Sequence, residues 1–442
     1  MSSGIIILFV TAATVFFYSR RRGLLPGPPP KLFIGNPHQL LPKNEPWRAY
    51  VTWANIYGPI FSFRVPNRQF IVLSSLKAAT ELFDARATMY SDRPKVWMLE
   101  LAKRNLNPFS ISYNHPYFKA YRTIFKNSLS TRAIQNYQSV QSEECRVLLD
   151  GLHKNPDCFT DHIGKNAAAV VLYLAYGWKV TDDDHLVSML QEAFDSTAVL
   201  IRPGRWWVEG MPLSKRQLYF VSEQLLPEVG SMVSAQQEDI IMRCSQVIYV
   251  GGLDTTASSM KSFILAMVLY PEVQKLAQVE IDAVVGQDRF PTFEDKDKLP
   301  YIGALALELL RWAPVTPQGQ PHDFFGVPAH PQQCRDVYEG YHIPKGAAII
   351  VNFVSMSRNE EIYPDPLEFR PERFLGPSPQ SDPRKFMFGF GRRRCPGLHL
   401  VEASLYLNTS CILAAFTIAK PLDERGEEIT LPPEYENIGP VW

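Results

Sequence analysis

One cysteine, Cys395, lies in a turn rich in glycine and arginine that leads directly into an apolar run, Leu398 to Ala415. The turn reads FGFGRRRCPG from Phe388 to Gly397, and the run after it predicts a helix. A thiolate ligates a metal only where its charge is stabilised, and backbone N–H groups, helix N-termini and guanidinium groups all stabilise it. The sequence therefore predicts a tight loop that offers one sulfur as a metal ligand.

Three other residues of this loop have separate roles in that hypothesis. Gly391 and Gly397 let the backbone fold closely around the sulfur. Phe388 can cover the sulfur and keep water out, which tunes the redox potential of an iron bound there. The alternative is a structural cysteine beside a basic loop, since free cysteine is among the most buried residue types.

Charge and cysteine usage argue against a nucleic-acid-binding protein and against a fold held together by disulfides. Lys+Arg and Asp+Glu both count 45, so the formal net charge is zero and nothing favours a nucleic-acid partner. The six cysteines are scattered without a C-x-x-C pair, which suits a reducing compartment. A hydrophobic content of 46% is ample for a large core.

The N-terminus predicts a membrane element. Gly4 to Tyr18 carries no charge and is followed by Arg20, Arg21 and Arg22, so residues 1–19 are expected to form a single transmembrane anchor, although about 20 apolar residues make a full span. The alternative, a cleaved signal peptide, would carry its charge before the apolar run. The positive-inside rule leaves the downstream chain in the cytosol. Residues 20–30, basic and proline-rich, predict a semi-rigid spacer.

The remainder, residues 31–442, predicts one mainly α domain with a smaller β part. Ile60 to Val65 and Gln69 to Leu73 are expected to form a β-hairpin, and a short strand pair is expected near Val337 to Ile350. Helical periodicity is found in five stretches: Leu76 to Ala85, Thr131 to Leu152, Ala167 to Tyr176, Ala235 to Tyr270, and a helix opened by Pro271.

Two adjacent glycines, Gly251 and Gly252, fall inside one of these helical stretches. Each costs a helix about 1 kcal/mol, so a close approach to a flat cofactor and a local widening of the helix are expected there. Asp254 and Thr255 follow, and an acid beside an alcohol can deliver protons to bound oxygen. The alternative is that Asp254 caps the start of a new helix.

Glu308 and Arg311 lie three residues apart, hence on one face of a helix. Alone, such a pair is an ordinary surface ion pair worth about 0.2–0.5 kcal/mol. Arg373 lies further on in an apolar, proline-locked segment, FRPERF from Phe369 to Phe374.

The spacing F-x-x-G-x-R-x-C-x-G over residues 388–397 resembles the haem-binding signature of the cytochrome P450 family. The resemblance implies the cytochrome P450 fold, with haem b (iron protoporphyrin IX) ligated by Cys395 and a propionate paired with Arg393. A guanidinium can hold a carboxylate through two parallel hydrogen bonds. The resemblance also makes Asp254 and Thr255 the acid and alcohol of the distal helix.

In the same family, residues corresponding to Glu308, Arg311 and Arg373 form a buried charged triad behind the haem-binding loop. The resemblance therefore implies that these three residues form that triad here. Its role would be structural.

The motif style resembles fungal microsomal members of secondary metabolism. It implies a monooxygenase that oxidises a lipophilic small molecule, and the expected substrates are secondary metabolites such as terpenoids. Electrons would come from NADPH through NADPH–cytochrome P450 reductase, with cytochrome b5 as a second candidate donor, since no dinucleotide-binding or flavin motif is found. The resemblance and the anchor together imply the endoplasmic reticulum membrane, with the catalytic domain in the cytosol.

The chain departs from the family in three places. Near residues 113–122, where the family has a tryptophan and two propionate-binding arginines, only Arg122 remains. His322 resembles the family's propionate-binding strand, but an apparent insertion (323–335) leaves the register open. The 208–250 region is short, so the alternative is an inactive haem- or ligand-binding relative with this fold.

Overall fold

The computed structural model describes residues 24–40, 45–66, 68–181, 187, 189, 235–324, 335–423 and 425–429. The chain divides into two compact units, Met1–Pro94 with Gln318–Asn352 and Lys95–Pro317 with Phe353–Trp442. The expected anchor, most of the short 208–250 region and most of the 323–335 insertion lie outside the described residues. The expected division at residues 19 and 30 stays a prediction.

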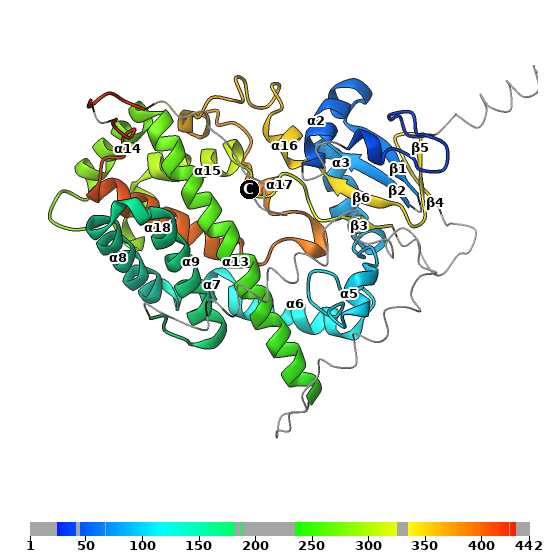
Figure 1. Ribbon diagram of the computed structural model, residues 1–442, viewed down its shortest axis with the longest axis horizontal. Coiled ribbons are helices and arrows are strands. Elements are labelled where there is room, and N and C mark those ends of the chain that lie inside the picture. The colour runs from blue at the N-terminus through cyan, green and yellow to red at the C-terminus, as the bar shows by residue number, and fades with distance from the viewer. Residues whose placement is uncertain are drawn as a thin grey trace, which may run out of the picture. The chain divides into compact units, whose positions relative to one another are not determined.

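The first unit is built on a four-stranded sheet with the order β1-β2-β6-β3 (Figure 1). The expected hairpin is confirmed, since Ile60 pairs with Leu73 in an antiparallel register. β6 adds to β2 in parallel and β3 adds to β6 antiparallel. The strands are β1 (Ile60–Val65), β2 (Arg68–Leu73), β3 (His322–Asp323) and β6 (Ala348–Val351).

A second, two-stranded sheet pairs β4 (Arg335–Tyr338) with β5 (Tyr341–Pro344). This hairpin is the strand pair expected near Val337, but β6 joins the larger sheet. The short helices of the unit are the 3-10 turn η1 (Pro37–Gln39), α2 (Pro46–Tyr57), α3 (Leu76–Thr80), the π-helical turn η2 (Glu81–Ala85) and α4 (Ala87–Tyr90).

The described part of the expected spacer is attached to this unit rather than standing free. The Ser62 N–H donates to the Pro26 carbonyl at 2.7 Å. The Asn36 side-chain amide donates to the Pro28 and Pro29 carbonyls at 3.2 Å each. A Cβ on Gly27 would lie 1.9 Å from the Ser62 oxygen, so only glycine allows this approach. Pro26 and Gly27 therefore contact β1, and Pro28 and Pro29 are bound by Asn36.

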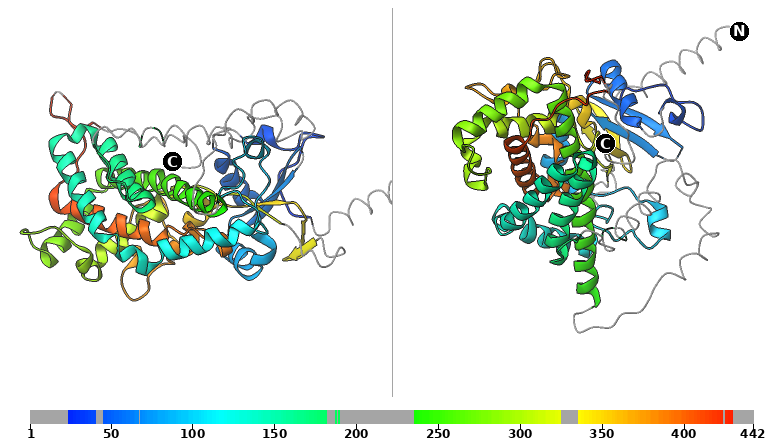
Figure 2. Two further views of the ribbon diagram at one scale, coloured as in Figure 1. Left: turned by 90° about the horizontal axis from the view of Figure 1, so that it is seen from below. Right: turned by 60° about the vertical axis from the view of Figure 1, so that its left-hand side comes forward.

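The second unit is helical, and its longest helix is α13 (Ala235–Leu269). α9 packs along α13, α8 packs on α9, and α18 contacts both α8 and α13. Figure 1 labels these helices, and Figure 2 gives two further views of them. The expected 131–152 helix is split into α7 and α8, and Ala167 to Tyr176 lies inside the longer α9. The α-helices with their bounds are α5 (Trp97–Leu101), α6 (Pro116–Leu129), α7 (Thr131–Gln135), α8 (Gln138–Lys154), α9 (Phe159–Tyr176), α14 (Pro271–Val284), α15 (Pro300–Trp312), α16 (Phe353–Ser357), α17 (Arg384–Met387) and α18 (Leu398–Ala415).

Short 3-10 turns connect these helices. They are η3 (Pro156–Cys158), η5 (Phe293–Lys298), η6 (Pro371–Phe374) and η7 (Gly391–Arg393). η6 carries Arg373, and η7 ends two residues before Cys395.

The apolar run after Cys395 forms α18 as predicted. Among the described residues, α18 alone is long and apolar enough to cross a membrane, and 67% of it is buried inside the protein. Its buried residues, from Leu400 to Leu413, include Ser404, Asn408, Thr409 and Ser410. Such burial within a helical core is typical of a central helix of a globular unit.

Candidate functional site

The loop that carries Cys395 is closed by its own backbone. The Cys395 N–H donates to the Phe388 carbonyl at 2.8 Å, and the Gly389 N–H donates to the Phe386 carbonyl at 2.9 Å. Gly389 and Gly391 have φ values of 73° and 57°, in the left-handed region that favours glycine. The glycines therefore set the bend that brings Phe388 next to Cys395.

Cys395 differs from the buried cysteines of the chain in its exposure. Cys395 is exposed, whereas Cys145, Cys244 and Cys411 are buried, and free cysteine is ordinarily buried. The backbone N–H groups of Gly397 and Leu398 act to lower the pKa of the Cys395 thiol. A Cβ on Gly397 would lie 3.8 Å from Sγ, in van der Waals contact. The loop thus presents an exposed cysteine with backbone donors beside its sulfur.

The charges around Cys395 favour its thiolate. Crowding by protein atoms raises the pKa of the Cys395 thiol, and the Gly397 N–H, Arg122 and Arg394 act in the opposite direction. The Arg122 guanidinium donates to the Arg394 carbonyl at 3.1 Å. Arg122 on α6 therefore both supports the loop and places a cation near the sulfur.

Arg393, the expected propionate partner, is held by a neighbouring loop. Its guanidinium donates to the carbonyls of Pro108 at 3.3 Å and Ile111 at 2.5 Å. It also lies 4.3 Å from the ring centroid of Phe118 on α6, a cation–π geometry. These contacts orient the side chain, and the pairing with a propionate stays a prediction. Phe118 is therefore part of the support of Arg393.

α13 runs without a break through Gly251 and Gly252. The expected widening of the helix is wrong, and so is the alternative in which Asp254 caps a new helix. A Cβ on Gly252 would lie 2.5 Å from Val171 Cγ1, and one on Gly251 would lie 3.5 Å from Phe109 Cζ. The close approach at Gly252 is thus made by helix α9, whose Val171 occupies the space of a side chain.

Asp254 and Thr255 lie in the middle of α13 and are half-buried. The Thr255 hydroxyl donates to the Gly251 carbonyl at 2.7 Å, so its oxygen lone pairs stay available to accept a hydrogen bond. The Ser259 hydroxyl in turn donates to the Thr255 carbonyl at 3.1 Å. The helix therefore holds an acid and an oriented alcohol side by side, and their role in proton delivery stays a prediction.

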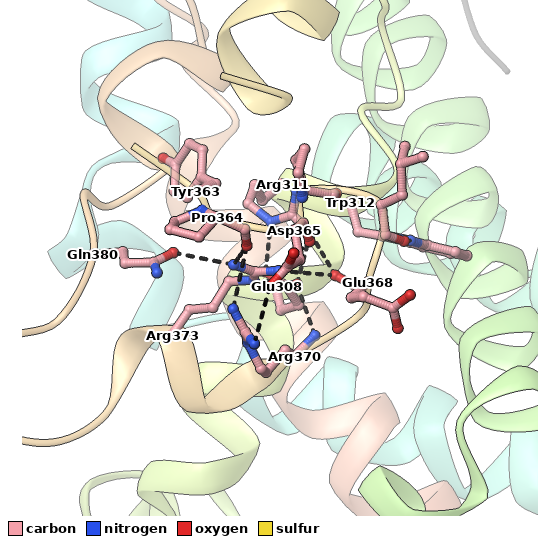
Figure 3. A network of polar contacts seen from close by, with 12 residues as sticks. Glu308, Arg311, Trp312, Tyr363, Pro364, Asp365, Glu368, Arg370, Arg373 and Gln380 are labelled. Carbon is pink, nitrogen blue, oxygen red and sulfur yellow. Dashed lines mark hydrogen bonds and ion pairs between the residues drawn. The ribbon is translucent and has the colours of Figure 1, made fainter. Parts of the chain in front are cut away.

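The structure brings Glu308, Arg311 and Arg373 together in one buried ion cluster (Figure 3). Arg311 binds Glu308 through Nε and Nη2, both at 2.7 Å. Arg373 Nε lies 3.2 Å from Glu308 Oε1. All three side chains have a solvent exposure of 0%. Glu308 and Arg311 therefore form a buried ion pair and not the surface ion pair that their spacing alone indicates.

Backbone carbonyls of a proline-rich segment complete the cluster. Arg311 donates to the carbonyls of Pro366 at 2.7 Å and Glu368 at 3.0 Å, and Arg373 donates to those of Pro364 and Asp365. Burial lowers the pKa of Arg373, while Glu308 acts in the opposite direction. The cluster therefore pins residues 364–368 to α15 and η6.

Three further contacts of this cluster were not indicated by the sequence. The Arg370 N–H donates to Glu308 Oε1 at 2.8 Å. Arg311 lies 5.5 Å from the ring centroid of Tyr363, and it donates to the Ser357 carbonyl at 3.1 Å. No local pattern identifies such partners, because they depend on which loop covers α15.

His322, the other expected propionate contact, lies in the first unit on β3 and is 9% exposed. Its Nδ1 is 2.8 Å from the Tyr90 carbonyl, which can only accept, so Nδ1 carries a proton. Its ring packs against Phe83 with a centroid distance of 4.4 Å. These contacts fix the ring, and its contact with a cofactor stays a prediction.

Comparisons with known proteins agree with one another. A family model described as Cytochrome P450 matches residues 25–209 and 214–434. The chain is 33% identical to cytochrome P450 monooxygenase claR of Ampulloclitocybe clavipes, covering 96% of this chain and 85% of the relative. It is 32% identical to cytochrome P450 monooxygenase ppsD of Aspergillus oryzae, covering 94% and 86%. It is 31% identical to tryptamine 4-monooxygenase of Psilocybe cyanescens, covering 98% and 94%.

The chain therefore belongs to the cytochrome P450 family, and it is a haem-thiolate monooxygenase. The family implies a haem, a redox partner that supplies electrons and a lipophilic substrate. The described residues fit the haem in one respect that the structure itself provides: an exposed cysteine whose thiol pKa is lowered by neighbouring backbone N–H groups and by Arg122 and Arg394, against the effect of burial.

Proposed function

We propose that the Cys395 thiolate holds the iron of haem b in this monooxygenase. The observation that carries the proposal is the combination of an exposed thiol with backbone donors from Gly397 and Leu398. Hydrogen bonds to a ligating sulfur and the burial around it tune the iron's reduction potential. Phe388 and Gly391 shape the loop around that sulfur. Bound in this way, the haem supplies the oxygen-activating chemistry of the reaction.

Residues of this chain would position the haem edge and support the loop. Arg393 already has an oriented guanidinium, and a planar fork suits a propionate. Arg122 supports the Cys395 loop through the Arg394 carbonyl. His322 is the third candidate contact for a propionate, because the segment that carries it resembles the family's propionate-binding strand.

Proton delivery is assigned to α13. The Thr255 oxygen would accept a hydrogen bond from a water molecule, since its own proton is engaged by the Gly251 carbonyl. Asp254 would replenish protons from solvent, because a half-buried carboxylate can exchange them with bulk water. The rigid helix keeps the two groups at a fixed spacing.

The substrate is proposed to be a lipophilic secondary metabolite, such as a terpenoid or a polycyclic aromatic compound. Fungal relatives of this chain support a role in specialised metabolism, and tryptamine 4-monooxygenase shows by its name that an aromatic amine is one substrate within the group. Electrons are proposed to come from NADPH through NADPH–cytochrome P450 reductase, with cytochrome b5 as a second donor.

Attachment to the endoplasmic reticulum membrane is proposed from the apolar segment Gly4 to Tyr18 and the arginines that follow it. That arrangement is typical of an anchor whose downstream chain is cytosolic. Fractionation tests this attachment: the full chain should remain in the membrane pellet after carbonate extraction, and recovery in the supernatant would contradict it.

The enzymatic proposal is tested by reconstitution. The full-length protein in microsomes with the reductase and NADPH is incubated with a panel of terpenoids and indole amines, and products are identified by mass spectrometry. Oxygenated product that requires both NADPH and the reductase is expected. Product formation by a Cys395→Ala variant at the parental rate would contradict the proposal.

A further inference from the structure

An ion pair joins the two helices that flank the Cys395 loop. Together with the acid that orients it, we name this group the clasp: Asp382, Arg384 and Glu402. Arg384 is the first residue of α17, which precedes the loop, and Glu402 lies near the start of α18, which follows it. The Arg384 guanidinium donates through Nη1 to Glu402 Oε1. The whole loop, residues 388–397, therefore lies along the chain between the two partners of one ion pair.

Both partners of this pair are held in place by other groups. Arg384 Nε lies 3.0 and 2.9 Å from the two Asp382 oxygens, and Nη2 lies 2.6 Å from Asp382 Oδ2. The Arg384 backbone N–H donates to Asp382 Oδ1 at 2.8 Å. On α18, His399 Nδ1 lies 3.3 Å from Glu402 Oε2. Because the guanidinium is a rigid plane, its bonds to Asp382 fix the direction in which Nη1 meets Glu402.

The clasp also reaches the residue next to the sulfur ligand. Arg394 donates through Nη2 to the Arg384 carbonyl at 3.2 Å. The Arg394 carbonyl in turn accepts a hydrogen bond from Arg122. Arg384 therefore contacts this region twice, through its side chain to the helix after the loop and through its carbonyl to the residue before Cys395.

The backbone of the loop benefits from such a constraint. Gly389 and Gly391 have positive φ values, and glycine has the widest choice of backbone conformations, so the loop can deform when the helices at its ends move apart. A metal ligand has to be held within about 0.5 Å of its productive position. Arg384 and Glu402 are 39% and 18% exposed, and the charges of a partly buried pair are screened less than those of a surface pair.

We propose that Arg384 and Glu402 are positioning residues of this monooxygenase, which hold the two ends of the loop together so that Cys395 stays on the iron as a thiolate. The proposal rests on the ligation of haem iron by Cys395 proposed above. Groups around a metal ligand orient it and tune the metal without touching the metal themselves. Neither residue is assigned a contact with haem or substrate. Loss of the clasp should therefore weaken the bond between sulfur and iron while haem is retained.

The test follows the iron ligand through the ferrous–carbon monoxide spectrum of the full-length protein in microsomes. Arg384→Met and Glu402→Gln each remove the ion pair and keep a side chain of similar length. At a fixed temperature below the unfolding midpoint, the red-shifted band should convert to the blue-shifted band about tenfold faster in each variant than in the parent, since a hydrogen bond between charged groups contributes a factor of this size. Total haem, measured as the pyridine complex, should stay at the parental level.

The double variant shows whether the two residues act as one unit. Arg384→Met combined with Glu402→Gln should convert at a rate within about twofold of Arg384→Met alone, because both changes remove the same bond. Single effects that multiply, to about a hundredfold over the parent, would indicate independent contributions. That result would overturn the clasp.

Asp295→Asn is the matched control for a general loss of stability. Arg289 binds Asp295 at 2.7 and 2.8 Å, and the Asp295 side chain is 3% exposed, but this pair lies outside the loop and its two flanking helices. The variant should lower the midpoint of thermal unfolding and leave the conversion rate within about twofold of the parent. Conversion as fast as in Glu402→Gln would show that the rate reports general stability, and would overturn the positioning role.

Two other results are decisive. Parental conversion rates in both Arg384→Met and Glu402→Gln would overturn the clasp while leaving the ligation by Cys395 intact. A parent protein that binds haem but shows no red-shifted band would refute that ligation, and with it the clasp.

Discussion

The most direct perturbation of the attachment of residues 364–368 is to remove the negative charge from the buried ion cluster of Glu308, Arg311 and Arg373. Glu308 accepts four hydrogen bonds, from Arg311 Nε and Nη2, Arg373 Nε and the Arg370 N–H. Glu308→Gln keeps the volume of the side chain but leaves two guanidinium groups buried without a counter-charge. It also turns an amide N–H₂ toward guanidinium donors, so at least one of the four bonds is lost.

The expected cost follows from that geometry. Breaking a buried ion pair by removing one partner costs about 3–5 kcal/mol, a large share of a typical stability of about 5–15 kcal/mol. The second unit has about 300 residues, so an unfolding entropy of ~2.1 cal/mol/K per residue converts this cost to roughly 5–8 °C. Thermal unfolding of the haem-loaded protein, followed by the Soret band and by circular dichroism, measures it.

Arg370→Met is the matched control in the same segment. The Arg370 side chain is 43% exposed and lies 3.7 Å from Asp365, while its backbone N–H still reaches Glu308 in the variant. An exposed pair of this kind contributes about 0–1 kcal/mol, so a shift of no more than about 2 °C is expected. Equal midpoints for Glu308→Gln and the parent protein would refute the assignment of the cluster as the support of residues 364–368.

Three further predictions concern the loop and α13. Cys395→Ala should abolish haem incorporation, and a normal Soret band in that variant would contradict the ligand assignment. Thr255→Ala should keep haem and stability, because its hydroxyl donates to Gly251 of its own helix. It should nevertheless divert electrons from product to peroxide, and unchanged coupling of NADPH to product would count against proton delivery. Gly252→Ala should lower the free energy of unfolding by about 1–3 kcal/mol through its clash with Val171, whereas Gly251→Ala should not; stability restored by adding Val171→Ala would confirm the cause.

The sequence indicated the ion cluster only in part. The spacing of Glu308 and Arg311 places both on one helical face, but the same spacing is common on exposed helices. The pair's burial depends on Arg373 and on the carbonyls of Pro364 and Pro366, which lie more than 50 residues away in the chain. Only the family resemblance connected Arg373 to the pair.

The glycines of α13 show why a local rule can mislead. Gly251 and Gly252 disfavour a helix, so a local widening of the helix was expected. The helix continues, because α9 packs against it and Val171 fills the space that a Cβ at Gly252 would need. Packing between elements far apart in sequence overrides propensity, and no pattern within the helix indicates it.

The proline-rich segment illustrates the same limit. Its composition predicts a stiff extended stretch, but composition does not show whether such a stretch stands free or packs on a surface. Asn36 and Ser62 decide this by hydrogen-bonding to the Pro26, Pro28 and Pro29 carbonyls. The loop around Cys395, by contrast, was predictable, because glycine positions and one cysteine define it locally.

The ferrous–carbon monoxide difference spectrum of the full-length protein in microsomes tests the central claim most directly. Ligation of haem iron by the Cys395 thiolate predicts the strongly red-shifted Soret band that a thiolate ligand produces, and its loss in Cys395→Ala. A blue-shifted band, or a red-shifted band that survives in Cys395→Ala, would contradict it.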